Sequence, residues 1–275
     1  RAQLKIRMAQ EANERKQREE LDQMKFRFFT NISHEFRTPL TLILTPLGAL
    51  IHDTGEPELK KKLEPIYNNA RRLLNLVNQL LDFRKLEMKG ERLRLKMNDM
   101  VFFLEEAVRQ FTDLAASREI ELSFEPKVER LFMNYDSDKM YKMLNNLLSN
   151  AFKFTSAHGQ VRVTLEKVSE DGRPYAAVRV EDTGCGIAEK DLPFVFDRFY
   201  QTATEGQPAG QGSGIGLHLV REYAKLHEGK VTVESRTGEG TAFTLYIPTD
   251  LHGGGAAPAA EEKAECRDEE SEIHD

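Results

Sequence analysis

The sequence predicts an α plus α/β fold, in which a two-helix hairpin is followed by an α/β sandwich domain. Residues 21–51 and 58–89 carry apolar side chains at helical spacing, and the turn Asp53–Pro57 separates them. From residue 92 the pattern changes to short alternating strands interspersed with helices. Three motifs rich in asparagine or glycine lie in this second part, each next to an element that could position it for ligand binding.

The apolar stripes of the two long helices predict a homodimer. The first helix has one stripe, formed by Ile32, Phe36, Leu40, Ile43, Leu47 and Leu50. The second helix has a heptad seam, formed by Ile66, Ala70, Leu73, Val77 and Leu80. A single hairpin leaves such stripes half covered, whereas two hairpins that form a four-helix bundle cover them.

The second domain is expected to span residues 92–249. Its strands are expected at 92–97, 120–125, 131–135, 160–168, 175–181, 230–235 and 241–247, and its helices at 99–117, 137–154 and 215–226. Residues 1–20 are expected to form a charged linker helix that follows an upstream sensor, residues 21–91 the hairpin, and residues 250–275 a flexible acidic linker.

Composition argues against several classes of function. The net charge of the 275 residues is -6, and the eight acidic and two basic residues of 261–275 account for all of it. The remainder is balanced, so a nucleic-acid partner is not expected. Two cysteines give no disulfide framework, and no apolar run is long enough to cross a bilayer, so no membrane contact is expected for this fragment.

His34 is the candidate phospho-acceptor. Helical spacing places it roughly 160° from the apolar stripe of its helix, so its side chain should face solvent. Glu35 is beside it and Thr38 is one turn further along. A neutral imidazole is a good nucleophile near neutral pH, and an adjacent carboxylate can orient it, which makes these three residues the candidate catalytic set.

The first motif of the second domain is Asn146–Lys153. Asn146 and Asn150 are four residues apart and share a helix face, and Lys153 follows one turn later. Amide oxygens suit a magnesium ion that keeps some of its waters, and the lysine suits a phosphate. A merely polar helix face would give the same pattern, so this motif alone is ambiguous.

The other two motifs contain glycine. Asp182–Ile187 follows a strand, so its carboxylate could accept a hydrogen bond from adenine while Gly184 and Gly186 allow close approach. Gly210–Leu217 opens a helix, where alternate glycines let backbone N–H groups hold phosphates. The stretch 202–212 before it is expected to form a lid over the nucleotide.

Taken together and in this order, the motifs resemble those of sensor histidine kinases, whose ATP-binding domain is shared with gyrase-type topoisomerases and Hsp90-type chaperones. His34–Leu40 resembles the H box, Asn146–Lys153 the N box, Asp182–Gly186 the first glycine box, Phe196–Tyr200 the F box and Gly212–Leu217 the second glycine box. Gly238–Phe243 resembles the closing glycine motif. The resemblance covers about residues 20–249.

The resemblance implies ATP and Mg²⁺ as cofactors and assigns a role to each motif. Asn150 would coordinate Mg²⁺ with help from Asn146, and Lys153 would contact phosphate. Asp182 would bind adenine, with Gly184, Gly186 and Thr241 close by. The phosphate end of the site would be shaped by Gly212, Gly214, Gly216 and Leu217.

The implied function is autophosphorylation of His34 followed by phosphotransfer to an aspartate of a response regulator receiver domain. The gyrase and chaperone branches typically carry a water-activating glutamate where this chain has Asn146, which disfavours a plain ATPase. A non-catalytic ATP-binding scaffold is the other alternative. Thr38 could serve a phosphatase activity. The chain looks like the cytoplasmic part of a hybrid sensor anchored in the inner membrane, with a receiver domain in the same chain.

Overall fold

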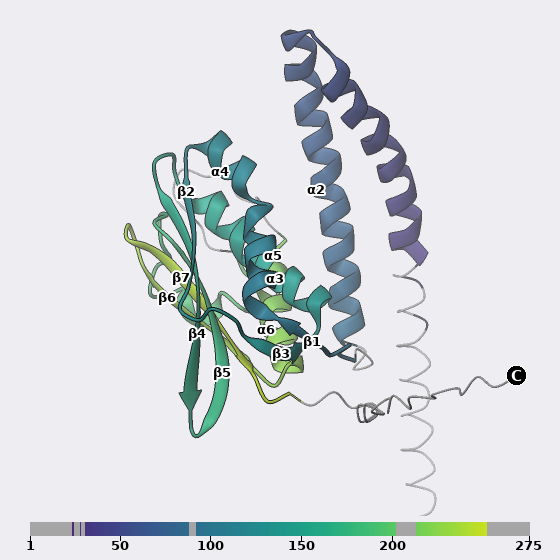
Figure 1. The fold of residues 1–275 in the computed structure, drawn as a ribbon. Coiled ribbons are helices and arrows are strands. Elements are labelled where there is room, and N and C mark those ends of the chain that lie inside the picture. The colour runs from purple at the N-terminus through teal and green to yellow at the C-terminus, as the bar shows by residue number, and fades with distance from the viewer. Residues whose placement is uncertain (1–23, 25–27, 29–30, 88–91, 202–212, 252–275) are drawn as a thin grey trace, which may run out of the picture.

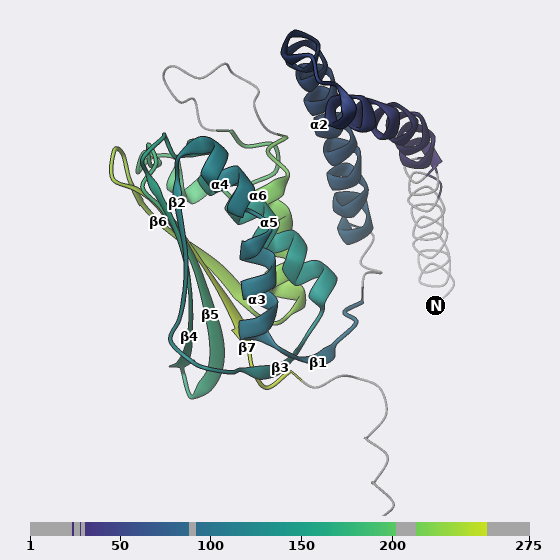
Figure 2. The ribbon, with the colours of Figure 1, turned by 45° about the horizontal axis from the view of Figure 1, so that its top comes forward.

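The computed structural model describes residues 24, 28, 31–87, 92–201 and 213–251. The first helix of the hairpin is continuous over residues 31–53, and the second, α2 (Pro57–Glu87), begins at a proline, a residue that suits the first position of a helix. These two helices run antiparallel, and α2 lies between the first helix and the second domain (Figures 1 and 2). Among the described residues, no helix has the length and apolar character that crossing a bilayer would need.

The second domain packs helices against one face of a sheet (Figure 1). Its five-stranded sheet has the order β2-β4-β5-β7-β6, and only the β2–β4 pair is parallel. The strands are β2 (Glu121–Pro126), β4 (Gln160–Glu170), β5 (Arg173–Asp182), β6 (Lys230–Arg236) and β7 (Gly240–Pro248). The covering helices are α3 (Met100–Arg109), α4 (Thr112–Arg118), α5 (Ser137–Phe154) and α6 (Gly216–Leu226).

The core lies between this sheet and α5 and α6. The face of α5 that points at the sheet is fully buried at Met143, Leu147 and Leu148. Opposite strand residues such as Val163 and Leu245 are equally inaccessible. The spacing of three and four along α5 and of two along the strands is what binary patterning requires of a helix packed on a sheet. The other face of the sheet is lined by charged pairs such as Arg179–Glu234.

The helix expected at 99–117 is two helices, so that prediction was wrong. Helix α3 ends at Arg109, and α4 begins at Thr112. Phe111 lies at the break and is buried, and its ring stacks on Phe152 of α5 with centroids 5.6 Å apart. The buried residues Leu104, Val108 and Ala115 keep helical spacing with Phe111 across the break, so α3 and α4 present the same side to the core.

The strand expected at 92–97 was also wrong in its position. The observed strand, β1 (Lys96–Asp99), pairs antiparallel with β3 (Phe132–Tyr135) in a separate two-stranded sheet. Residues 92–95 have no strand partner. Instead, the backbone N–H of Arg94 donates to the Asp136 carboxylate at 2.8 Å, so this segment fastens the start of α5.

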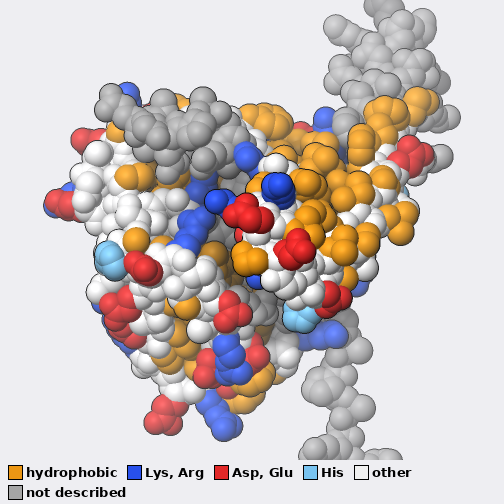
Figure 3. All heavy atoms as spheres, turned by 90° about the horizontal axis from the view of Figure 1, so that it is seen from above, with side chains coloured by type: hydrophobic (Ala, Val, Ile, Leu, Met, Phe, Trp, Pro, Cys, Tyr) orange, Lys and Arg blue, Asp and Glu red, His pale blue; other side chains and the backbone are white. Residues whose placement is uncertain are grey.

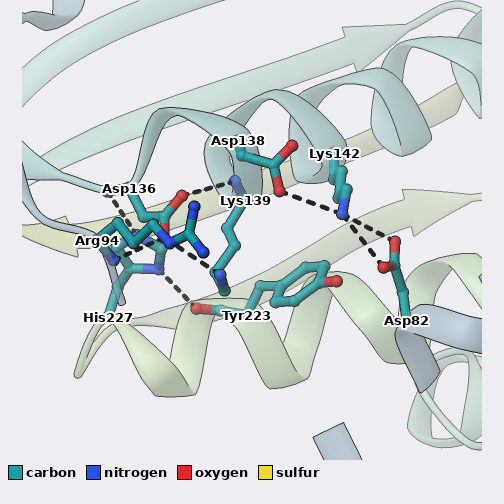
Figure 4. Close-up of polar contacts among 8 residues, drawn as sticks. All are labelled: Asp82, Arg94, Asp136, Asp138, Lys139, Lys142, Tyr223 and His227. Atoms are coloured by element: carbon teal, nitrogen blue, oxygen red, sulfur yellow. Dashed lines mark hydrogen bonds and ion pairs between the residues drawn. The ribbon is translucent and has the colours of Figure 1, made fainter. Parts of the chain in front are cut away.

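The start of α5 is fixed by a buried polar cluster around Asp136 (Figure 4). This carboxylate caps the helix by accepting from Lys139 N, and it also pairs with the Lys139 ammonium at 3.1 Å. The N–H of Asp136 donates to Nε2 of the buried His227, whose Nδ1 lies 2.8 Å from the Tyr223 carbonyl oxygen. That geometry requires a neutral ring protonated at Nδ1, and burial lowers the pKa of His227 accordingly. The cluster therefore joins α5 to α6.

Candidate functional site

Helix α5 forms one wall of the candidate site. Asn146, Asn150 and Lys153 are partly buried on it, while the neighbouring Leu147 and Leu148 are in the core. The apolar positions thus fix the rotation of the helix and leave the asparagines on the face turned away from the sheet. The structure confirms that these three residues share one face, as their spacing predicts.

The second glycine motif lies against Asn146. A Cβ atom added to Gly216 would come 2.6 Å from Oδ1 of Asn146, so any larger residue there would require the Asn146 side chain to move. The Asn146 Nδ2 group donates to the Lys142 carbonyl at 2.8 Å, which leaves Oδ1 facing the start of α6. Gly214 has a φ of +66°, a left-handed conformation in which a glycine is favoured. Leu217 is partly buried one residue into α6.

The Asp182 loop lies at the other end of α5. A Cβ atom on Gly184 would approach the Phe154 carbonyl oxygen to 2.6 Å, so the loop packs on the last turn of the helix. Asp182 itself is buried, and its Oδ1 accepts from Gly184 N at 2.9 Å. Gly186 adopts a φ of +70° against the backbone of Arg236. The three motifs, distant in sequence, therefore meet along α5.

The strand register brings the closing hairpin to the same loop. Thr241 of β7 pairs with Asp182 of β5. Ser235 of β6, a residue that the sequence interpretation missed, accepts from Ile187 N at 2.8 Å and lies 2.9 Å from the Thr241 hydroxyl. Its pairing with Thr241 follows from the register of the β6–β7 hairpin, which was the available signal. Ser235 thus ties the glycine loop to the sheet.

The electrostatics of the site suit a nucleotide. Burial raises the pKa of Asp182 to about 6, although the N–H groups of Gly184 and Thr241 oppose the rise. At neutral pH the carboxylate is ionised and can accept from an amino group. Burial lowers the pKa of Lys153, and the nearby positive charge of Arg72 on α2 lowers it further. The positive charges of Lys153 and Arg72 are close enough to affect each other, and an anion bound near both of them would be stabilised.

The donor set fits Mg²⁺ better than a transition metal. Within the part of the chain that the structure describes, no group of three or more histidine, cysteine, aspartate or glutamate side chains could hold a metal ion. Asn146 and Asn150 offer neutral amide oxygens only. Mg²⁺ accepts a site of this kind because it keeps water and phosphate oxygens among its ligands.

The structure leaves the phospho-acceptor candidate exposed on the hairpin. His34, Glu35 and Thr38 all face solvent, as the periodicity predicts, whereas Ser33 and Leu40 are buried between the helices. The Thr38 hydroxyl donates to the His34 carbonyl at 3.2 Å. The first helix lies on the far side of α2 from the second domain (Figures 1 and 2). The structure therefore does not bring His34 to its own chain's α5.

The hairpin instead contacts the second domain through the end of α2. The side chain of Gln79, which sequence interpretation did not single out, lies within hydrogen-bonding distance of both Asn146 and Ser213. Phe83 is buried between this end of α2 and the F-box segment, with its ring 6.0 Å from that of Phe199. Gly212 and the predicted lid at 202–212 lie outside the described residues, as do the predicted linker at 1–20 and residues 252–275 of the linker predicted at 250–275.

Comparison with known proteins gives two adjacent family matches. Residues 24–89 match the His Kinase A (phospho-acceptor) domain. Residues 135–251 match the family described as histidine kinase-, DNA gyrase B- and HSP90-like ATPase. The first match contains His34, and the second contains all three motifs that meet along α5.

Curated relatives and a solved structure agree with these matches. Histidine kinase P4 of Formosa agariphila is 38% identical over 90% of this chain, which spans 18% of that protein. Hybrid signal transduction histidine kinase D of Dictyostelium discoideum is 37% identical over 83% of this chain, which spans 15% of that protein.

Full-length ShkA, solved in complex with AMPPNP, is 27% identical, with a TM-score of 0.65 over 81% of this chain and 45% of its own. The chain thus spans less than a fifth of the length of the two curated relatives. With a phospho-acceptor hairpin followed by the matching ATP-binding domain, the chain belongs to the histidine kinases.

Proposed function

We propose that this chain transfers the γ-phosphate of ATP to His34 and that the phosphate then passes to an aspartate of a response regulator receiver domain. The observation that carries the proposal is the meeting of three motifs along α5. Asn146 touches Gly216, and the last turn of α5 touches Gly184, although these partners are far apart in the sequence. A solvated helix face would not require glycine against the Phe154 carbonyl, and it would not place Asn146 so close to a second glycine.

In the proposed site, each residue has a distinct task. Asp182 holds the adenine amino group, and the N–H groups at the start of α6 face the phosphates. Asn150 and Asn146 hold Mg²⁺, which supplies charge neutralisation on the phosphates when it is bound. Lys153, next to Arg72, supports the phosphate end through its positive charge.

On the hairpin side, the transfer step uses the imidazole of His34 and a neighbouring carboxylate. The ring nitrogen of His34 that lacks hydrogen attacks the γ-phosphorus, and the bond from that phosphorus to the bridging oxygen of ADP breaks. The proton on the other ring nitrogen passes to Glu35, which also stabilises the charge that the ring gains. Because α2 lies between the first helix and the second domain, this step requires either an undocked second domain or that of a partner copy.

The proposal includes the partners that a phospho-acceptor hairpin implies. Two copies form a four-helix bundle, and a receiver domain, in a separate protein or in the same full-length chain, accepts the phosphate. Thr38 serves phosphatase activity by orienting water. The fragment acts in the cytoplasm, and the full-length protein is anchored in the inner membrane. Support for the dimer comes from apolar side chains gathered on the hairpin surface, which Figure 3 shows in orange.

A plain ATPase and a non-catalytic scaffold are the competing functions. No observation favours the ATPase, because Asn146 stands where a water-activating base would be needed and its Nδ2 is already bonded to Lys142 O. A scaffold would not need an exposed histidine flanked by a carboxylate.

One experiment separates the three functions. The chain is incubated with Mg²⁺ and γ-labelled ATP, alongside the Asn150→Ala variant. Acid-labile, base-stable protein label that is lost in Asn150→Ala supports the kinase. Release of labelled phosphate without protein label would support the ATPase. Nucleotide binding with neither label nor release would support the scaffold, and both of these outcomes would overturn the proposal.

A further inference from the structure

One face of the last turns of α2 is docked on the second domain. Asp82 pairs with Lys142 of α5 at 3.0 Å (Figure 4), and Glu87 pairs with Arg198 of the F-box segment at 2.7 Å. Between these pairs, Phe83 is only 4% exposed and packs edge-on against the rings of Phe199 and His218. The spacing of these α2 residues places them on one side of the helix, so the contact is continuous.

Gln79 lies on the same face, one turn before Phe83, and reaches two parts of the nucleotide site at once. Its Nε2 is 3.4 Å from Oδ1 of Asn146, and its Oε1 accepts from the Ser213 hydroxyl at 2.7 Å. The Ser213 hydroxyl also accepts from Ile215 N at 3.2 Å, at the turn that opens α6. One side chain of the hairpin therefore bridges the asparagine motif and the second glycine motif.

This bridge uses the atom of Asn146 that a metal would need. Nδ2 of Asn146 is bonded to the Lys142 carbonyl, so the amide cannot turn without losing that bond. Its Oδ1 is confined between Gly216 and Gln79. In the docked arrangement, the only ligand atom that Asn146 can offer to Mg²⁺ is directed at the hairpin.

We propose that Gln79 makes docking of the hairpin and binding of Mg²⁺–nucleotide mutually antagonistic. This inference rests on the proposed function, because it assigns Oδ1 of Asn146 to the metal. When Mg²⁺–nucleotide binds, Asn146 leaves Gln79 and the end of α2 loses one of its anchors. The second domain can then leave α2 more readily and reach a phospho-acceptor. Bound Mg²⁺–nucleotide therefore favours release of the second domain from the hairpin.

Thermodynamic linkage sets the expected size of the effect. If docking weakens Mg²⁺–nucleotide binding by some factor, Mg²⁺–nucleotide weakens docking by the same factor. One hydrogen bond of ordinary net strength corresponds to a change of about fivefold in an equilibrium constant. The effect must depend on the metal, because nucleotide without Mg²⁺ does not use Oδ1 of Asn146 as a ligand.

The test compares affinities for AMPPNP with Mg²⁺ and with EDTA, measured calorimetrically on the whole 275-residue chain. Gln79→Ala should leave the affinity for AMPPNP in EDTA unchanged. It should increase the ratio of the affinity in Mg²⁺ to the affinity in EDTA, the Mg²⁺ enhancement, about fivefold. Gln79→Met should behave alike, because it keeps the length of the side chain and removes both hydrogen bonds. Asn69→Ala, which removes an exposed amide earlier on α2, is the matched control and should equal the unsubstituted chain.

The outcomes separate this inference from the proposed function. An equal Mg²⁺ enhancement in the unsubstituted chain and both Gln79 variants would overturn the inference alone. A lack of Mg²⁺-dependent binding in the unsubstituted chain would overturn the proposed function and the inference with it. Hydrogen exchange gives a second readout, in which Mg²⁺–AMPPNP should speed exchange at the end of α2 whereas AMPPNP in EDTA should not. Unchanged or slower exchange with Mg²⁺ would overturn the inference.

Discussion

At the scale of single residues, Asp182 should give nucleotide binding its pH dependence. Burial raises its pKa to about 6, and the ionised carboxylate accepts a hydrogen bond from an adenine amino group more strongly than the protonated carboxyl group does. Affinity should therefore be constant well above about pH 6 and fall as the pH drops below it. Calorimetric titration with AMPPNP across this range measures it.

Asp182→Asn is the control for that pH dependence. The amide does not titrate, so its weaker affinity should stay level over the same range. An affinity of the unsubstituted chain that is equally level down to about pH 5 would contradict the role assigned to Asp182.

Gly216→Ala should weaken nucleotide binding without unfolding the domain. The added methyl group would come 2.6 Å from Oδ1 of Asn146, a flexible side-chain atom that must move. Because Asn146 supports the metal in the proposed site, the Mg²⁺-dependent part of the affinity should fall about tenfold or more. Gly55→Ala, where a Cβ meets nothing within 4 Å, is the control. Equal affinities in the two variants would count against the assigned site.

Residue-scale prediction from the sequence succeeded where a residue belongs to a local motif. Asn146, Asn150 and Lys153 share the predicted face because helical geometry fixes it over so short a distance. Gln79 was missed because its partners Asn146 and Ser213 are 67 and 134 residues away. Nothing in the sequence around a glutamine on a long polar helix indicates such a contact.

At the scale of elements, Asp136 should control the stability of α5. Asp136→Ala removes the helix cap and the carboxylate that pairs with the buried Lys139 ammonium, which costs about 3 kcal/mol in the free energy of unfolding. Asp138→Ala, which removes a largely exposed carboxylate from the same turn, should cost less than about 1 kcal/mol. Urea denaturation of both variants measures the difference, and equal losses would refute the assignment.

The pKa of Asp136 determines how the stability that this cluster contributes changes with pH. Its burial would raise the pKa, but hydrogen bonds from Arg94 N, Lys139 N and the Lys139 ammonium outweigh it and hold the pKa below its ordinary value. A carboxyl group with a depressed folded-state pKa contributes stability above its unfolded pKa, and this contribution is lost as pH falls through the folded value. Asp136→Ala should therefore flatten the acid limb of the stability profile.

Element prediction failed at two places. The helix over 99–117 was expected as one because its buried residues keep helical spacing throughout, and this spacing does not reveal the break that the structure shows at residues 110–111. The strand at 92–97 was misplaced because the Arg94 N–H group donates to the Asp136 carboxylate that caps α5. That contact joins residues 42 positions apart, which a local window does not contain.

At the scale of the whole molecule, the hairpin should dimerise through its exposed apolar seam. Ile66 and Leu73 of α2 are 54% and 45% exposed in the single chain. Their joint substitution, Ile66→Glu with Leu73→Glu, should yield a monomer, because like charges would face each other in the bundle. Lys61→Glu on the exposed surface of α2 is the control. Sedimentation equilibrium reads out both, and a dimeric double variant would contradict the bundle.

Sequence patterns predicted the hairpin and the second domain individually better than they predicted how the two dock on each other. The periodicity of each helix predicts its buried face, but docking of α2 on α6 and α5 depends on matched side chains such as Phe83 and Phe199. The structure places the second domain against α2 rather than against the first helix (Figure 1). Only the three-dimensional arrangement shows that transfer needs rearrangement or a partner copy.

The most direct test of the central claim is to locate the phosphate on the protein after incubation with Mg²⁺ and ATP. His52 lies on the same helix as His34 and is also exposed, so His52→Gln is a matched control for His34→Gln. Mass spectrometry of peptides kept at neutral to alkaline pH should find phosphate on His34 in the unsubstituted and His52→Gln chains and none in His34→Gln. Phosphate that persists in His34→Gln at the level of the control would contradict the account.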